Sequence, residues 1–184
     1  METVREVCTY IGSVVGSAPV CIETGCTYSM PPGNEIHTTT NNIYEYIVCP
    51  NGGHLFSLDI DSEHVDISRS ILYKIDMDVH SFDFMLGDSV ESMIQLSSIL
   101  KKVNKEVNVL WLDSSGCPNH TLSEFMAVQS LLSSEGHFVL VDDIHNPNSI
   151  KYKKVVPLLK QLNYKYKEIQ TPTGLFLSSM GYDL

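Results

Sequence analysis

Five apolar segments of this 184-residue sequence each end in side chains that could bind a ligand. Continuous apolar runs of this length are typical of strands buried on both faces of a parallel sheet. Because the carboxyl ends of parallel strands meet at one edge of a sheet, we expect these side chains to converge there. They are Glu23 and Gly25, Asp59 and Asp61, Asp88 and Ser89, Asp113, and Asp142 and Asp143.

Acidic residues at such an edge suit two kinds of binding chemistry. A carboxylate after the second strand, such as Asp59, can accept hydrogen bonds from both hydroxyls of a ribose, although it follows Glu23 by more than the usual roughly 20 residues. Separately, Asp113, Asp142 and Asp143 supply the hard oxygen ligands that Mg²⁺ or Ca²⁺ prefers. The alternative for any one of these acids is a helix cap or a turn residue.

The segments between the apolar runs have the periodicity of amphipathic helices, so strands and helices alternate. We expect strands at 19–23, 54–60, 82–86, 107–113 and 137–143, and helices at 39–48, from 62, and at 90–103, 120–134 and 150–162. Two final strands, 164–170 and 174–180, lie too close together for a crossover helix, so one of them must run antiparallel. This pattern predicts a doubly wound α/β domain.

Composition limits the class of protein further. An apolar content of 43% and a charged content of 18% are typical of one globular domain, here residues 1–184. No apolar run approaches the roughly 20 residues of a membrane span, and no secretory signal is recognisable, so we expect a cytoplasmic protein without a membrane partner. A net charge of −10 disfavours nucleic acid as a partner. Five scattered cysteines indicate reduced thiols.

The segments CIETGC, SLDID, GDS, VLWLDSSG and FVLVDDIHNP resemble those of the class I S-adenosylmethionine (SAM)-dependent methyltransferases. The resemblance extends from Val20 to Met180. Within the class it is closest to small-molecule O-methyltransferases of the catechol and macrolide-sugar type and to cephalosporin-hydroxylase-like proteins. It implies a Rossmann-like three-layer sandwich, SAM and Mg²⁺ (or another divalent cation) as cofactors, and methyl transfer to a small hydroxylated acceptor.

The resemblance also implies a role for individual residues. Glu23 and Gly25 would face the amino-acid end of SAM. Asp59 would bind the ribose, and Ile60 would lie beside it. Asp88 and Ser89 would lie along the adenine. Asp113, Asp142 and Asp143 would hold the metal, with His145 or His120 near it as general base; the implied catalytic residues are His145, His120 and Asp113.

The glycine-rich motif of that family is only partly present. The family has glycines at alternate positions after the first strand, whereas here Gly25 alone is in register and a Pro-Pro-Gly loop follows. We expect SAM contacts in this region from Gly33, Asn34 or the threonine run 38–40, with Thr39 as the leading candidate. The first 19 residues supply at most a short helix over the site. The lack of a lid domain favours a homo-oligomer in which a partner subunit covers the pocket.

Two alternatives to a methyltransferase stay open at this point. One is a different enzyme on the same fold, hydroxylase-like or using another adenosine ligand, in which Asp59 would still bind a ribose. The other is a binding module without catalytic activity, which the missing glycines after Gly25 would allow.

Overall fold

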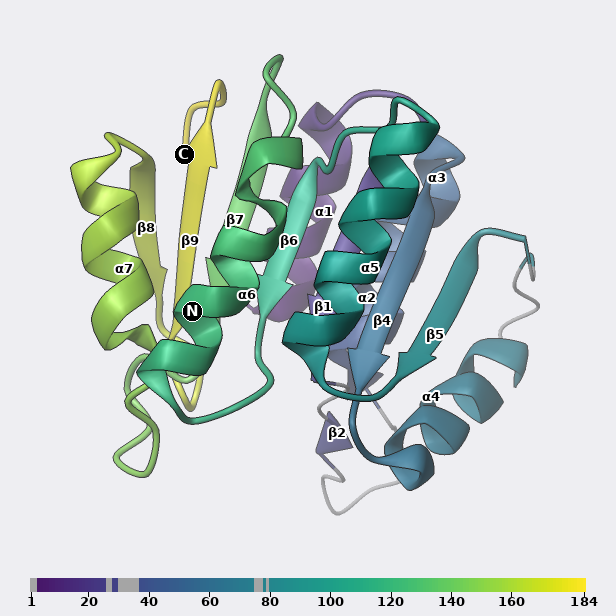
Figure 1. Ribbon diagram of the computed structural model, residues 1–184, viewed down its shortest axis with the longest axis horizontal. Helices are drawn as coiled ribbons and strands as arrows, with labels where there is room; N and C mark the ends of the chain where they lie inside the picture. Colours follow the sequence, from purple (N-terminus) through teal and green to yellow (C-terminus); the bar gives the residue numbers. More distant parts are fainter. Residues whose placement is uncertain (1–2, 26–27, 30–36, 75–77, 79) are drawn as a thin grey trace.

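A seven-stranded sheet forms the middle of three layers in the computed structural model, which describes residues 3–25, 28–29, 37–74, 78 and 80–184 (Figure 1). The strand order is β5-β4-β1-β6-β7-β9-β8. The strands of this sheet are β1 (Val20–Thr24), β4 (His54–Asp59), β5 (Phe82–Leu86), β6 (Val109–Leu112), β7 (His137–Val141), β8 (Lys165–Ile169) and β9 (Leu175–Met180). A separate antiparallel pair consists of β2 (Tyr28–Ser29) and β3 (His37–Thr38).

Five strands run parallel, and the last two form an antiparallel hairpin, as the sequence predicts. β1 pairs in parallel with β4 and β6, β4 with β5, and β6 with β7. β9 runs antiparallel between β7 and β8. The chain extends outward from β1 in both directions, so the topological switch point lies between β1 and β6, where α/β sheets bind their ligands.

Helices cover both faces of the sheet, with α5, α6 and α7 in front and α1, α2 and α3 behind in Figure 1. The helical segments are α1 (Val4–Val14), α2 (Thr39–Ile43), η1 (Tyr44–Val48, a π-helix), α3 (Cys49–Asn51), α4 (Ser62–Lys74), α5 (Ser89–Lys102), α6 (Pro118–Val128), η2 (Gln129–Leu131, a 3₁₀ turn) and α7 (Tyr152–Gln161). Among the described helices, none has both the length and the apolar character required of a membrane span.

Each face of the sheet contributes to its own hydrophobic core, because alternate side chains of a strand point to opposite faces. In β1, Cys21 belongs to the core beneath α1 and η1, whereas the next residue, Ile22, belongs to the core beneath α5, α6 and α7. All five residues of β1 are buried, and so are all five of β7. These continuous apolar runs are therefore buried on both sides, as expected.

The N-terminal segment differs from expectation. Residues Val4–Val14 form an 11-residue helix that begins with a capping box between Thr3 and Glu6. Val7, Cys8 and Ile11 are buried in the core behind the sheet, against η1, so α1 is a structural layer and does not cover the predicted binding edge. The predicted helix 39–48 also differs, because it contains a π-helical segment and continues to Asn51.

The contact between α1 and η1 depends on Gly12. A Cβ at this position would lie 1.9 Å from the carbonyl oxygen of Tyr46. Gly12→Ala should therefore destabilise the protein by about 1–3 kcal/mol, although alanine is ordinarily the better helix former. Chemical denaturation measures the change, and Ser13→Ala, at an exposed position of the same helix, serves as control. A Gly12→Ala protein as stable as its parent would contradict this packing.

Candidate functional site

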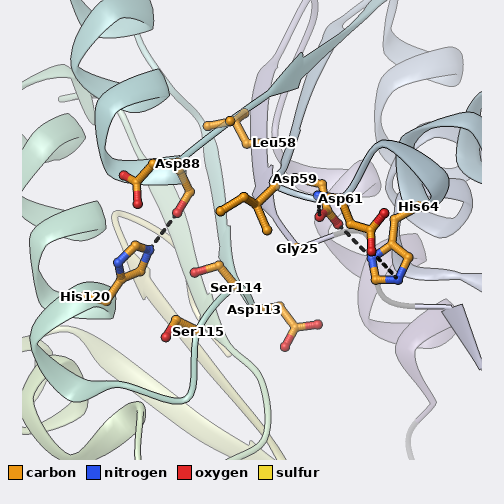
Figure 2. Close-up of a pocket in the computed structure, with 13 residues that line it drawn as sticks. Gly25, Leu58, Asp59, Asp61, His64, Asp88, Asp113, Ser114, Ser115 and His120 are labelled. Carbon is orange, nitrogen blue, oxygen red and sulfur yellow. Dashed lines mark hydrogen bonds and ion pairs between the residues drawn. The ribbon is translucent and has the colours of Figure 1, made fainter.

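A pocket of about 770 Å³ lies at the carboxyl ends of the parallel strands, beside the switch point (Figure 2). Its volume is in the range of small-molecule binding sites. Its described lining residues are Gly25, Leu58, Asp59, Ile60, Asp61, His64, Gly87, Asp88, Ser89, Asp113, Ser114, Ser115 and His120. The polar residues at the first four strand ends thus converge as predicted, except that Glu23 lies beneath the surface.

Gly25 allows the ends of β1 and β6 to approach closely at the base of the pocket. Its φ of +78° is in the left-handed region, which glycine adopts without strain. A Cβ there would lie 2.7 Å from the carbonyl oxygen of Asp113. A side chain at this position would force the two strand ends apart.

Glu23 is fully buried at the end of β1 and is only partly hydrogen-bonded. Its Oε2 accepts hydrogen bonds from the hydroxyls of Thr40 (2.8 Å) and Ser57 (3.2 Å), whereas Oε1 has no hydrogen-bond partner among the residues that the structure describes. Burial, reinforced by the negative charges of Asp113 and Asp59, raises the pKa of Glu23 to about 8. A buried carboxyl oxygen without a hydrogen bond costs stability. This position is therefore suited to a ligand that donates a hydrogen bond to that oxygen.

The predicted SAM contact Thr39 has a different environment. It is the half-buried first residue of α2 and is not among the described lining residues. Its neighbour Thr40 makes the hydrogen bond to Glu23 instead. Gly33 and Asn34 lie outside the described residues.

Asp59 forms one wall of the pocket at the end of β4. Its Oδ1 accepts a hydrogen bond from the backbone N–H of Asp61 (2.8 Å), and Oδ2 lies 3.3 Å from Nδ1 of His64. Ile60 is 77% exposed yet lines the pocket, so it presents an apolar surface beside the carboxylate. Sequence reasoning missed His64, although its position in the first turns of α4, five residues after Asp59, was a usable signal.

The opposite wall is formed by the start of α5 and by α6. Asp88 caps α5, because its Oδ1 accepts hydrogen bonds from the backbone N–H groups of Val90 (3.0 Å) and Glu91 (3.1 Å). The capping alternative therefore holds for this acid, and Asp88 lines the pocket as well. Figure 2 shows Asp88 and His120 on one side of the pocket and Asp59 and His64 on the other, with Asp113 between the two groups.

A buried glutamate, Glu124, orients the polar groups of this wall. Ser89 donates to Glu124 Oε1 (2.5 Å), and Ser89 Oγ also lies 2.8 Å from Nε2 of His120. The Ser89 hydroxyl therefore links His120 to the buried carboxyl of Glu124. Ser114 also donates to Glu124, whose pKa is raised by burial. Glu124 lies within a helix, away from any strand end, so the sequence pattern did not identify it.

The three acids predicted to bind metal are arranged around a lysine that the sequence analysis did not identify. Lys151 Nζ lies 2.5 Å from Asp113 Oδ1 and 3.3 Å from Asp143 Oδ2. Asp142 has other partners, since its Oδ1 accepts from the backbone N–H of Asp143 (2.7 Å) and the hydroxyl of Thr173 (3.3 Å). Burial and the nearby charge of Asp113 raise the pKa of Asp142 to about 7.

These residues do not fit the predicted divalent-metal site. Among the residues that the structure describes, no three His, Cys, Asp or Glu side chains are grouped so that they could share an ion. An ammonium already contacts Asp113 and Asp143, and it would repel a second cation at that distance.

His145 lies apart from the pocket. Its side chain is 44% exposed, its Nε2 lies 3.9 Å from Glu168 Oε2 on β8, and its ring packs against Gly174. It is not among the described lining residues. Of the two predicted histidines, only His120 reaches the pocket.

Known structures with the same fold include enzymes that act on different substrates. A protein from Staphylococcus aureus, proposed to be a caffeoyl-CoA O-methyltransferase, matches with a TM-score of 0.70 and 12% identity over 98% of this chain and 85% of that chain. A proposed methyltransferase from Streptococcus mutans, in complex with S-adenosylhomocysteine (SAH), matches with a TM-score of 0.62 and 14% identity over 97% of both chains. Precorrin-8w decarboxylase from Methanobacterium thermoautotrophicum matches with a TM-score of 0.61 and 12% identity over 99% of this chain and 92% of that chain.

These similarities establish the fold of the chain. With the two short strands left out, the sheet has the order 3-2-1-4-5-7-6 and a C-terminal antiparallel hairpin, which is the class I methyltransferase fold. No protein-family model matches the sequence, and no curated protein matches it significantly. The similar structures include a decarboxylase, so the reaction must be argued from the pocket.

The raised pKa of Glu23 should make stability depend on pH in a specific direction. The folded carboxyl titrates at about 8 against an ordinary value of 4.5, so between these pH values unfolding releases a proton. Stability from this group is therefore lost as pH rises. Compared with the Glu23→Gln variant, the ligand-free parent protein should lose on the order of a few kcal/mol of unfolding free energy between pH 5 and pH 8.

Urea denaturation at several pH values measures this difference. Glu91→Gln, which changes an exposed glutamate of α5, is the matched control and should leave the pH dependence unchanged. A Glu23→Gln protein with the same pH dependence as its parent would show that Glu23 is ionised in the folded state.

Proposed function

We propose that this chain is a SAM-dependent methyltransferase that acts on a small hydroxylated acceptor. The observation that carries the proposal is the buried Asp59 carboxylate at the end of β4, on the wall of a pocket at the switch point. A carboxylate in this position can accept hydrogen bonds from both hydroxyls of a ribose. The fold shared with a proposed methyltransferase that was solved with SAH supports SAM as the nucleoside ligand.

The remaining pocket residues are compatible with the other parts of SAM. Ile60 offers an apolar contact for the adenine ring, and Asp88 and Ser89 offer polar groups for its edge. At the other end of the ligand, Oε1 of Glu23 has no hydrogen-bond partner in the described part of the chain and is suited to the amino group of the methionine moiety. That ammonium would also favour the ionised form of Glu23.

SAM, when bound, supplies an electrophilic methyl group. The contribution of the protein is to hold the acceptor in line with that group and to exclude water, and such positioning can supply several kcal/mol. Asp113 is the predicted catalytic residue best placed to orient an acceptor hydroxyl, because it lies between the two walls of the pocket (Figure 2). His120 contacts Ser89, so we assign it to the adenine side.

The metal-assisted form of the reaction is left out of this proposal, because the described acids do not form a metal site. His145 is left out as a general base because it lies apart from the pocket.

Calorimetric titration with SAH and SAM tests the proposal. Both should bind, and Asp59→Asn should weaken SAH binding by about 10–100-fold, since hydrogen bonds to a charged group contribute about 1.5–3 kcal/mol. Asp66→Asn, at an exposed position of α4, is the control for a lost carboxylate and should bind normally. Thermal unfolding shows whether each variant is folded.

Failure to bind either ligand would contradict the proposal. Preferential binding of NAD or an adenosine phosphate would favour a different enzyme on the same fold. Binding of SAM without methyl transfer to any member of a panel of small phenols, sugars and hydroxy acids would favour a binding module.

A further inference from the structure

We propose that the ammonium of Lys151 is a built-in counter-ion that holds Asp113 at the wall of the pocket, so that this site operates without a divalent metal. The part concerning the reaction rests on the proposed function. The ion pair, and the lack of a metal site among the described residues, follow from the geometry alone.

The ion pair between Lys151 and Asp113 is shielded from solvent at both ends. The Lys151 side chain is 2% exposed and that of Asp113 is 3% exposed. A buried charge is strongly unfavourable unless an opposite charge compensates it. The 2.5 Å contact to Asp113 and the 3.3 Å contact to Asp143 supply that compensation. This pair therefore differs from a surface salt bridge, which contributes little.

The position of Lys151 in the fold explains how it reaches the strand ends. It immediately precedes α7, which covers the front face of the sheet beside α6 (Figure 1). Asp113 follows β6, and Asp143 follows β7 with a left-handed φ of +62°. The lysine thereby connects the ends of two neighbouring strands to the start of a helix.

Two of the three acids share one cationic partner, and the third is held by other groups. Asp113 and Asp143 pair with Lys151, whereas Asp142 accepts hydrogen bonds from Thr173 and from the backbone of Asp143. A divalent cation needs about six oxygen ligands within roughly 2.0–2.6 Å. The ammonium supplies positive charge at the same acids without that geometric requirement.

Lys151 acts on the pocket through Asp113. Asp113 lines the pocket, but Lys151 is not among its described lining residues. Lys151 is therefore a positioning residue: it fixes the direction and the charge of the carboxylate that we assign to the acceptor hydroxyl. A flexible or protonated Asp113 would orient an acceptor less well.

Metal binding by the chelator-treated protein is the first test. Titration with MnCl₂, followed by the electron paramagnetic resonance signal of free Mn²⁺, should show no saturable site tighter than about 1 mM. SAH affinity should change by less than about twofold between buffers with EDTA and with MgCl₂. One stoichiometric Mn²⁺ or Mg²⁺ bound by the unaltered protein would overturn the inference.

Variants at Lys151 provide the second test. Lys151→Met leaves Asp113 and Asp143 without their cation, so it should lower the unfolding temperature and create a Mn²⁺ site that restores it. Lys151→Met combined with Asp143→Asn should regain part of the stability without metal, and Lys151→Arg should stay metal-independent. A Lys151→Met protein that is as stable as its parent would overturn the ion-pair role. If the Lys151→Met protein does not fold, the Mn²⁺ titration of the unaltered protein still tests whether the site binds a divalent metal.

The outcomes separate this inference from the proposed function. Binding of SAH without metal binding supports both. Binding of SAH together with a saturable metal overturns the role of Lys151 and leaves the methyltransferase proposal standing. Absence of both SAH and metal binding overturns the methyltransferase proposal while the ion pair remains.

Discussion

The close approach of β1 and β6 at Gly25 is the constraint on which the pocket depends. With no Cβ at this position, the backbone of β1 turns with a positive φ directly beside the carbonyl of Asp113. The buried Glu23 and the pocket residue Asp113 follow from that approach, because they lie at the ends of the same two strands. Backbone packing at Gly25 therefore determines where the acidic side chains lie at the switch point.

Buried acids are the second feature of the site. A different set of groups compensates for the burial of each one. Lys151 neutralises Asp113, the backbone of the following turn and His64 satisfy Asp59, and serine hydroxyls satisfy one oxygen of Glu124. Glu23 and Glu124 are both fully buried, each has a raised pKa, and each has one oxygen without a hydrogen-bond partner among the described residues; the pKa of Glu23 is raised to about 8. Of these acids, Glu23 has the most to gain from a cationic ligand.

The sequence predicted the sheet and the location of the site because both depend on local pattern. Continuous apolar runs identified the parallel strands, and their polar ends identified the edge at which Gly25, Asp59 and Asp113 meet. It did not predict the partners of those residues, because Lys151 and Glu124 come from other elements and their contacts are set by helix packing. For the same reason, spacing alone did not show that Asp142 and His145 have partners away from the pocket.

A crystal structure of the protein soaked with SAH would test the central claim most directly. We expect SAH in the pocket at the switch point, with both ribose hydroxyls hydrogen-bonded to Asp59 and the amino group of the ligand within reach of Glu23. Electron density for SAH elsewhere, or a ribose turned away from Asp59, would contradict it.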